Sequence, residues 1–263
     1  MKKLVLIVLA IGLVVPALAA AEGLPSSKAT ADVNTLVKCT MSTATANDAT
    51  AVIPASCVNL WNGDAVAVAG DIWIPIMDKP VKLSNSQSLF VSPSLVSGLY
   101  TRTRTKTQTG STSTAQAMGA VYLRAVLTPA DGSPDIVAAP LNLCTASIFG
   151  CAAPETNKWG VVLDSRIQTL TQELSACTVI VGDQQGTCSF TSIIDLVLQT
   201  ASAHTFNFIF PNVGQGTYTL KVYAAVGSDA SILAGSGTAV GSAVFGLGSV
   251  TVESVRLVHG FEF

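Results

Sequence analysis

The sequence has little charge, few aromatic residues and only two histidines. Charged residues make up 11% of the chain and aromatic residues 6%, and 14 basic side chains stand against 16 acidic ones. A protein that binds nucleic acid needs a surplus of clustered lysine and arginine to displace the counterions around the phosphates. The composition therefore excludes nucleic acid as the expected partner.

The motifs that mark common catalytic sites are also missing. The chain has no GxSxG, HExxH or P-loop sequence, the signatures of serine hydrolases, zinc proteases and nucleotide-binding proteins. His204 alternates with three phenylalanines, which favours a buried or interfacial imidazole over a general base. Asp131 and Asp135 flank a turn but lack the dense acidic pattern of calcium loops. We therefore predict a non-catalytic protein without cofactor or metal.

No apolar run of membrane-spanning length follows the first 21 residues. Residues 1–21, MKKLVLIVLAIGLVVPALAAA, comprise two lysines, an apolar run, a proline and small residues. This layout predicts a signal peptide cleaved after Ala19 or Ala21; an uncleaved anchor helix is the alternative, because the run reaches the lower limit for a membrane span. Cleavage would leave 12 of the 14 basic residues against 16 acidic ones. We predict a secreted, periplasmic or cell-surface protein with no membrane span after leader removal.

Cysteine is scarce but even in number. In an exported chain six cysteines indicate disulfides, because the compartment is oxidising. Zinc is disfavoured, since the chain has no CxxC spacing and few histidines. The six residues fall into three couples that are close in sequence, and we predict that each couple is a disulfide: Cys39 with Cys57, Cys144 with Cys151, and Cys177 with Cys188.

The chain after the leader divides into two parts. Residues 22–60 are rich in alanine, threonine and serine with little periodicity. We predict a flexible or loop-like N-terminal segment there, tied down by the Cys39–Cys57 disulfide. Residues 61–263 carry short alternating segments separated by Asn, Ser, Pro and Gly, which is typical of antiparallel strands in one β-domain.

Two strands carry irregularities that the sequence helps to locate. Pro75 lies in the alternating run DIWIPIMD and cannot donate a hydrogen bond to a ladder, which predicts an edge strand or a bulge. In the last strand the apolar positions change face, so we expect a bulge near Glu253 or Ser254. RIQTLTQELSAC and SIIDLVLQTASA fit either helix or strand. We predict an all-β fold: an antiparallel β-sandwich of jelly-roll type with at most one or two short helices.

The stretch YTRTRTKTQT places cations and threonines on opposite faces of one strand. Arg102, Arg104 and Lys106 share one face and the threonines share the other. The cations form either a docking strip for an anionic polysaccharide, a lipid headgroup or an acidic partner, or a solvent-facing row that prevents edge-to-edge mispairing. Trp73 and Tyr122 are the best candidates for stacking on a glycan, although a tryptophan in a sandwich more often lies in the core.

These patterns favour a structural or adhesive role at the cell surface, with recognition of a polysaccharide or a protein. Few charges and a mean hydropathy of +0.52 make a homo-oligomer an expected partner, because apolar surface that one core cannot bury tends to seek another molecule. The first alternative is a carbohydrate-binding module. A glycan-active hydrolase is less favoured, as is an outer-membrane β-barrel, which the alternating C-terminal Phe263 suggests and the six cysteines disfavour.

Overall fold

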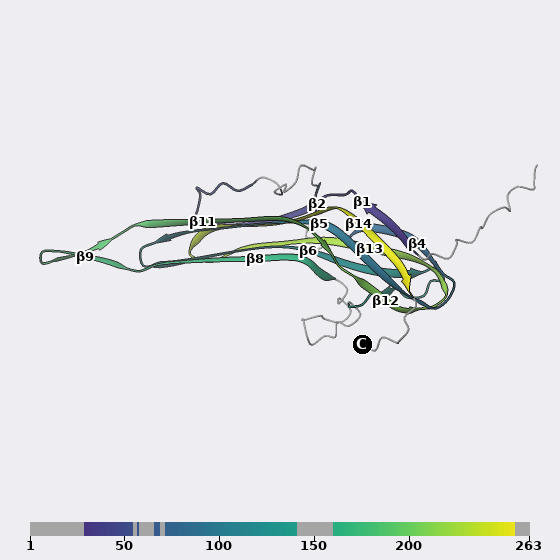
Figure 1. Ribbon diagram of the computed structural model, residues 1–263. Coiled ribbons are helices and arrows are strands. Elements are labelled where there is room, and N and C mark those ends of the chain that lie inside the picture. The colour runs from purple at the N-terminus through teal and green to yellow at the C-terminus, as the bar shows by residue number, and fades with distance from the viewer. Residues whose placement is uncertain (1–28, 55–56, 58–65, 69–71, 141–159, 256–263) are drawn as a thin grey trace, which may run out of the picture.

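The structure, a computed structural model, describes residues 29–54, 57, 66–68, 72–140 and 160–255. The regular elements within these residues are all β-strands, so the all-β prediction is confirmed. Figure 1 shows an elongated molecule in which two layers of strands lie one above the other. The described part of the chain has no helix long and apolar enough to cross a membrane.

The upper layer in Figure 1, here called sheet A, has seven strands. Its strands pair in the order β11 (Thr191–Thr205), β5 (Gln87–Gln108), β14 (Ser236–Val255), β2 (Lys38–Ala46) and β3 (Val66–Ala67), with β1 (Ala29–Asn34) beside β14 and β12 (Phe208–Val213) beside β5. The short β2–β3 pair is parallel and the other pairs are antiparallel. β1 and β2 follow one another along β14, as β11 and β12 do along β5.

The second layer, sheet B, has five antiparallel strands. They pair in the order β4 (Ile74–Leu83), β13 (Gly216–Ala234), β6 (Ser111–Pro129) and β7 (Ile136–Val137), with β8 (Val161–Leu174) also beside β6. A separate hairpin, β9 (Cys177–Val181) and β10 (Gln184–Cys188), connects β8 in sheet B to β11 in sheet A. It forms the tip at the far left of Figure 1.

The strand order is that of a jelly roll. When β1 with β2, and β11 with β12, are each taken as one strand, and the short β3, β7 and the β9–β10 hairpin are set aside, eight strands remain in chain order. When these eight strands are numbered along the chain, the order across sheet A is 6-3-8-1, from β11 to β2. The order across sheet B is 2-7-4-5, from β4 to β8. This interleaving is the double Greek key that defines the jelly roll, so the predicted sandwich has the predicted arrangement.

The space between the sheets is packed differently at its two ends. At the end near β12 and β4, large apolar side chains such as Phe208, Phe210 and Phe245 are fully buried. At the end near the β9–β10 hairpin, a smaller cluster is built from alanines of β6 and β14. Gly119 lies between these regions, where a Cβ would come within 2.6 Å of the carbonyl oxygen of Ser242 in the facing sheet. The two backbones are therefore in direct contact there.

Part of the N-terminal segment expected to be loop-like is sheet. β1 pairs with β14 through residues 248–253, and β2 pairs with it through residues 237–245. Main-chain hydrogen bonds to β14 order these residues although they have few large apolar side chains and hence weak periodicity. The predicted Cys39–Cys57 disulfide is present in this segment, and Cys39 is buried beside Val244.

The structure also tests the expected strand irregularities and the two segments that fit either helix or strand. The expected irregularity at Pro75 is confirmed, since β4 is an edge strand and its register with β13 shifts next to Pro75. The expected bulge near Glu253 or Ser254 is wrong: the shift in β14 lies at Leu247, whose φ is 44° and which glycines flank. Both segments left open between helix and strand form strands, β8 and β11.

Two further expectations concern the cysteines and the leader. The Cys177–Cys188 disulfide joins the two strands at the base of the β9–β10 hairpin, as predicted. Cys144, Cys151 and the expected leader at residues 1–21 lie outside the described residues.

Candidate functional site

The strand that carries the alternating threonines and cations, β5, lies in the middle of sheet A. β11 and β12 pair with one of its edges and β14 with the other. Its threonines Thr101, Thr103, Thr105 and Thr107 face sheet B and are fully buried. The interpretation of the cations as guards of an edge strand is therefore wrong, because both edges of β5 are already paired.

The two arginines of β5 lie on the outer face of sheet A and bind a carboxylate of the neighbouring strand. Arg102 donates from Nε to Asp195 Oδ1 at 2.9 Å and from Nη2 to Asp195 Oδ2 at 2.6 Å. Nη1 of Arg104 lies 3.6 Å from the same Oδ2 atom. Asp195 thus sits between the two cations, and a bidentate contact of this kind is stronger than a single ion pair.

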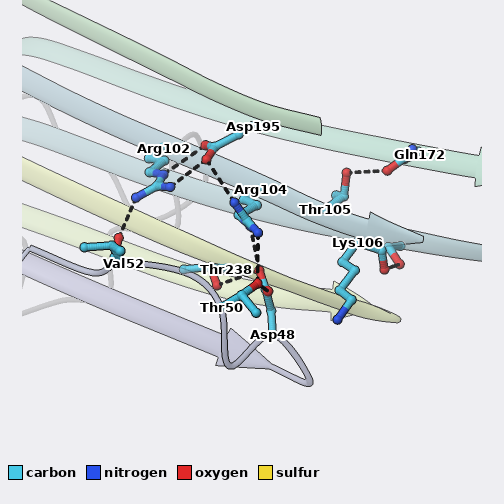
Figure 2. A network of polar contacts seen from close by, with 11 residues as sticks. Asp48, Thr50, Val52, Arg102, Arg104, Thr105, Lys106, Gln172, Asp195 and Thr238 are labelled. Atoms are coloured by element: carbon cyan, nitrogen blue, oxygen red, sulfur yellow. Dashed lines mark hydrogen bonds and ion pairs between the residues drawn. The ribbon is translucent and has the colours of Figure 1, made fainter. Parts of the chain in front are cut away.

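A second carboxylate, Asp48, binds Arg104 from the loop that follows β2. Its side chain has no exposed surface and accepts a hydrogen bond from Arg104 Nε at 2.9 Å. The hydroxyls of Thr50 and Thr238 donate to it at 2.9 Å and 3.4 Å. Figure 2 shows these groups converging on Asp48 from β5, β14 and the loop. The network therefore holds the loop against the outer face of sheet A.

The contacts keep both carboxylates ionised. Burial acts to raise the pKa of Asp48, but the hydrogen bonds from Thr50 and Arg104 outweigh it and the pKa lies below its ordinary value. The hydrogen bond from Arg102 lowers the pKa of Asp195. The same bond raises the pKa of Arg102. Two positive and two negative charges thus compensate one another.

Lys106 differs from the two arginines. It is half-buried on the same face of β5, and within the described residues no carboxylate lies close enough to form an ion pair with its ammonium group. In Figure 2 no dashed line joins its ammonium group to the arginine network. Of the three cations that alternate along β5, the two arginines are therefore paired with carboxylates, and Lys106 is not paired with one of the described carboxylates.

Trp73 and Tyr122 lie by sheet B. The guanidinium of Arg124 on β6 lies 4.6 Å from the centre of the Trp73 ring and 4.7 Å from that of Tyr223. Burial lowers the pKa of Arg124, although Tyr223 acts in the opposite direction. Tyr122 is two residues before Arg124 and shares its face of β6. Arg124 and Tyr223 were not predicted from the sequence, because only the pairing of β6 with β13 brings them together.

His204 lies in a cluster that resembles a catalytic triad only in its residue types. Nε2 of His204 is 2.6 Å from the Ser202 hydroxyl and 3.5 Å from Asp164 Oδ2. In a triad the carboxylate holds the other ring nitrogen, so that Nε2 is left for the serine. Here both groups meet at one nitrogen. Asp164 also accepts a hydrogen bond from Ser97 at 2.5 Å, so the cluster links β8 to β5 and β11.

Two further features of the described residues bear on metal and ligand binding. They contain no group of three or more His, Cys, Asp or Glu residues placed to hold a metal ion. A hollow of about 330 Å³ lies where β1, β5 and β14 meet, lined by residues such as Asn34, Leu95 and Leu247. Its lining has no charged side chain, histidine or cysteine.

Exposed apolar side chains concentrate on β11 and the β9–β10 hairpin. We call the β11 residues Ile193, Ile194, Leu196, Val197 and Leu198 the β11 strip; their exposed fractions range from 39% to 49%. On the hairpin, Val179, Ile180 and Val181 are also exposed. This surface was not predicted from the sequence, because an apolar run does not reveal whether a strand will be central or at an edge.

The comparisons with known proteins identify no family and no curated relative for this chain. Among solved structures it is similar to a chain of infectious bursal disease virus, Gt strain, with 11% identity over 93% of this chain and a TM-score of 0.14. The Salmonella type III secretion secretin InvG, in the open gate state, has 7% identity over 67% of this chain and 62% of its own, with a TM-score of 0.12. The chain spans 47% of the viral chain, and scores this low carry no argument.

Proposed function

We propose that this is an exported, non-catalytic structural or adhesive protein that acts at the cell surface as a self-associating subunit. The observation that supports it is the concentration of exposed apolar side chains on the β11 strip and the β9–β10 hairpin. Contiguous exposed apolar surface on a protein marks an interaction site. The leader-like N-terminus and the two disulfides support an oxidising destination outside the cytoplasm.

The compensated charges of sheet A support the same role. Arg102 and Arg104 bind Asp195 and Asp48 within the chain, so they are poorly placed to hold an anionic ligand. Their contacts instead stiffen the face of the sheet and fix the loop after β2. A rigid sandwich with an apolar edge is suited to packing against other subunits.

The test is the mass of the purified protein beginning at residue 22. Light scattering is measured from low to high micromolar concentration at moderate salt, with oxidised cysteines. We expect a mass that rises to a defined multiple of the subunit mass. A monomer throughout this range would overturn the self-associating role.

One arrangement favours a second candidate, a carbohydrate-binding module. Trp73 and Tyr223 lie against Arg124 on sheet B, and Tyr122 lies on the same face of β6; planar aromatic rings on a sheet face are suited to stacking on sugars. An array of neutral and acidic glycans tests it, with Tyr122→Ala as the variant and Phe190→Ala, an exposed aromatic residue of the β10–β11 turn, as the control. Binding that only Tyr122→Ala weakens would support this candidate, and an array without binding would exclude it for the glycans used.

A further inference from the structure

We propose that β11 pairs edge to edge with β11 of a second copy, antiparallel and about a two-fold axis, so that two copies of sheet A form one continuous sheet. This inference rests on the proposed self-association and names the surface and the partner. The partner is the chain itself, because its β11 offers an edge of the same length and chemistry.

No strand among the described residues pairs with the outer edge of β11. In the described part of the chain β11 pairs with β5 alone, through residues 191–205. A free edge presents a row of main-chain donors and acceptors to any strand that approaches, and natural proteins usually protect it with lysine, proline or a bulge. β11 has no lysine, arginine or proline, and its register with β5 is unbroken.

The apolar run of β11 has side chains on both faces. Ile194, Leu196 and Leu198 lie on the face directed toward sheet B, and Ile193 and Val197 lie on the outer face. Apolar residues on both faces are typical of a strand that is covered on both faces, whereas a strand with one solvated face normally alternates apolar with polar residues. All five side chains are at least 39% exposed in the single chain, and a strand of a second copy beside β11 would shield their flank that is directed away from β5.

The charge on this edge permits two copies to approach. Asp195 is the only acidic residue of β11, and Arg102 and Arg104 of the same chain already compensate it. From residue 22 onward the chain has 12 basic and 16 acidic residues, so two copies repel each other weakly. Two copies therefore repel each other least when they meet through an edge whose charge is compensated within each chain.

The requirement that like faces meet restricts the register to those with a residue on the two-fold axis. Opposite residues in an antiparallel pair point to the same face of a sheet. With Leu196 on the two-fold axis, Ile194 lies opposite Leu198 of the second copy, and Asp195 lies opposite Val197. This register joins apolar residues on the inner face and keeps the two Asp195 side chains apart.

The first test uses a charge at the expected contact. In Val197→Glu the new carboxylate lies beside Arg102 of its own chain, which favours the folded subunit, but it faces Asp195 of the second copy. We expect the dimer dissociation constant to rise by roughly a hundredfold, because like charges in contact oppose association. The matched control is Ile72→Glu, an exposed isoleucine just before β4, at the opposite edge of sheet B, which we expect to dimerise like the wild type.

The second test is a crosslink, which reports the contact without adding charge. Leu196→Cys and Val197→Cys are oxidised separately, with Ile72→Cys as the control and thermal unfolding as a check of the fold. A covalent dimer through position 196 or 197, and none through 72, supports the proposal. If the wild type associates but Val197→Glu associates equally well and neither β11 cysteine crosslinks, the edge pairing is overturned while the proposed function stands. A monomeric wild type overturns the proposed function and the pairing with it.

Discussion

At the scale of single residues, the interior of this sandwich is unusually polar. Thr101 donates to Gln168 Oε1 at 2.6 Å, and Gln168 Nε2 donates to Thr103 at 2.6 Å. Thr105 donates to Gln172 Oε1 at 2.9 Å. A buried hydroxyl without a partner keeps its full desolvation cost, whereas a paired one recovers most of it. Hydrogen bonding of each threonine therefore decides whether it stabilises the fold.

Thr107 is the exception, and it offers a clean comparison with Thr105. Within the described residues its buried hydroxyl has no hydrogen-bond partner, whereas that of Thr105 is paired with Gln172. Both residues are fully buried on the same face of β5. We expect Thr107→Val to stabilise the protein by up to about 1 kcal/mol and Thr105→Val to destabilise it by about 1–2 kcal/mol. Urea unfolding of the two isosteric variants measures the difference, and equal effects would contradict this account.

The ionised network on sheet A makes stability depend on pH. The pKa values of Asp48 and Asp195 are lowered in the folded protein, so the unfolded chain binds protons more readily. Their contribution is fully present above the unfolded value of about 3.9 and is lost as pH falls through the folded values. We expect the free energy of unfolding to fall as the pH drops below about 4.

The Asp48→Asn variant tests whether this network is the source. At neutral pH we expect it to lose about 3 kcal/mol of stability, because Arg104 is left without its buried partner, and to show a shallower decline in acid. Asp135→Asn removes the same charge from an exposed residue and serves as the control. Chemical unfolding between pH 3 and 7 gives both curves, and identical slopes for Asp48→Asn and the wild type would locate the pH dependence elsewhere.

At the scale of elements, alternation and turn chemistry make some strands predictable from the sequence and leave others hidden. The strands around Pro75 and the phenylalanines of β12 carry large apolar residues on alternate positions, so the sandwich could be expected. β1 and β2 could not, because their small polar residues are ordered by pairing with a strand about 200 residues away. For the same reason the partners of Arg102 and Arg104 were hidden, since Asp48 and Asp195 come from distant segments.

The close approach of the sheets is a second feature that the sequence conceals. A Cβ on Gly241 would overlap the carbonyl oxygens of Met118 and Asp229 in sheet B. We expect Gly241→Ala to cost at least about 3 kcal/mol, because the obstacle is backbone and cannot rotate away. Gly186→Ala is the control, since its Cβ would meet only the Val179 carbonyl oxygen at 3.7 Å. Thermal unfolding compares the two, and similar melting temperatures would argue against direct contact of the sheets.

At the scale of the whole molecule, the jelly roll separates two kinds of surface. The outer face of sheet A carries an internally compensated charge network and a loop fixed by the Cys39–Cys57 disulfide. The side where β8 and β11 end their sheets carries exposed apolar residues that continue toward the hairpin. Association is therefore expected to depend on the apolar side and on the net charge, and little on individual surface ion pairs.

This separation predicts how association responds to salt. From residue 22 the chain has four more acidic than basic residues, so two copies repel over a distance set by the Debye length, about 30 Å at 0.01 M salt and about 8 Å at 0.15 M. Because the β11 strip itself is apolar, salt screens this repulsion without weakening the contact. We expect sedimentation equilibrium to show tighter association at 0.15 M than at 0.01 M. Weaker association at the higher concentration would mean that ion pairs hold the copies together, which would argue against an apolar strand edge as the contact.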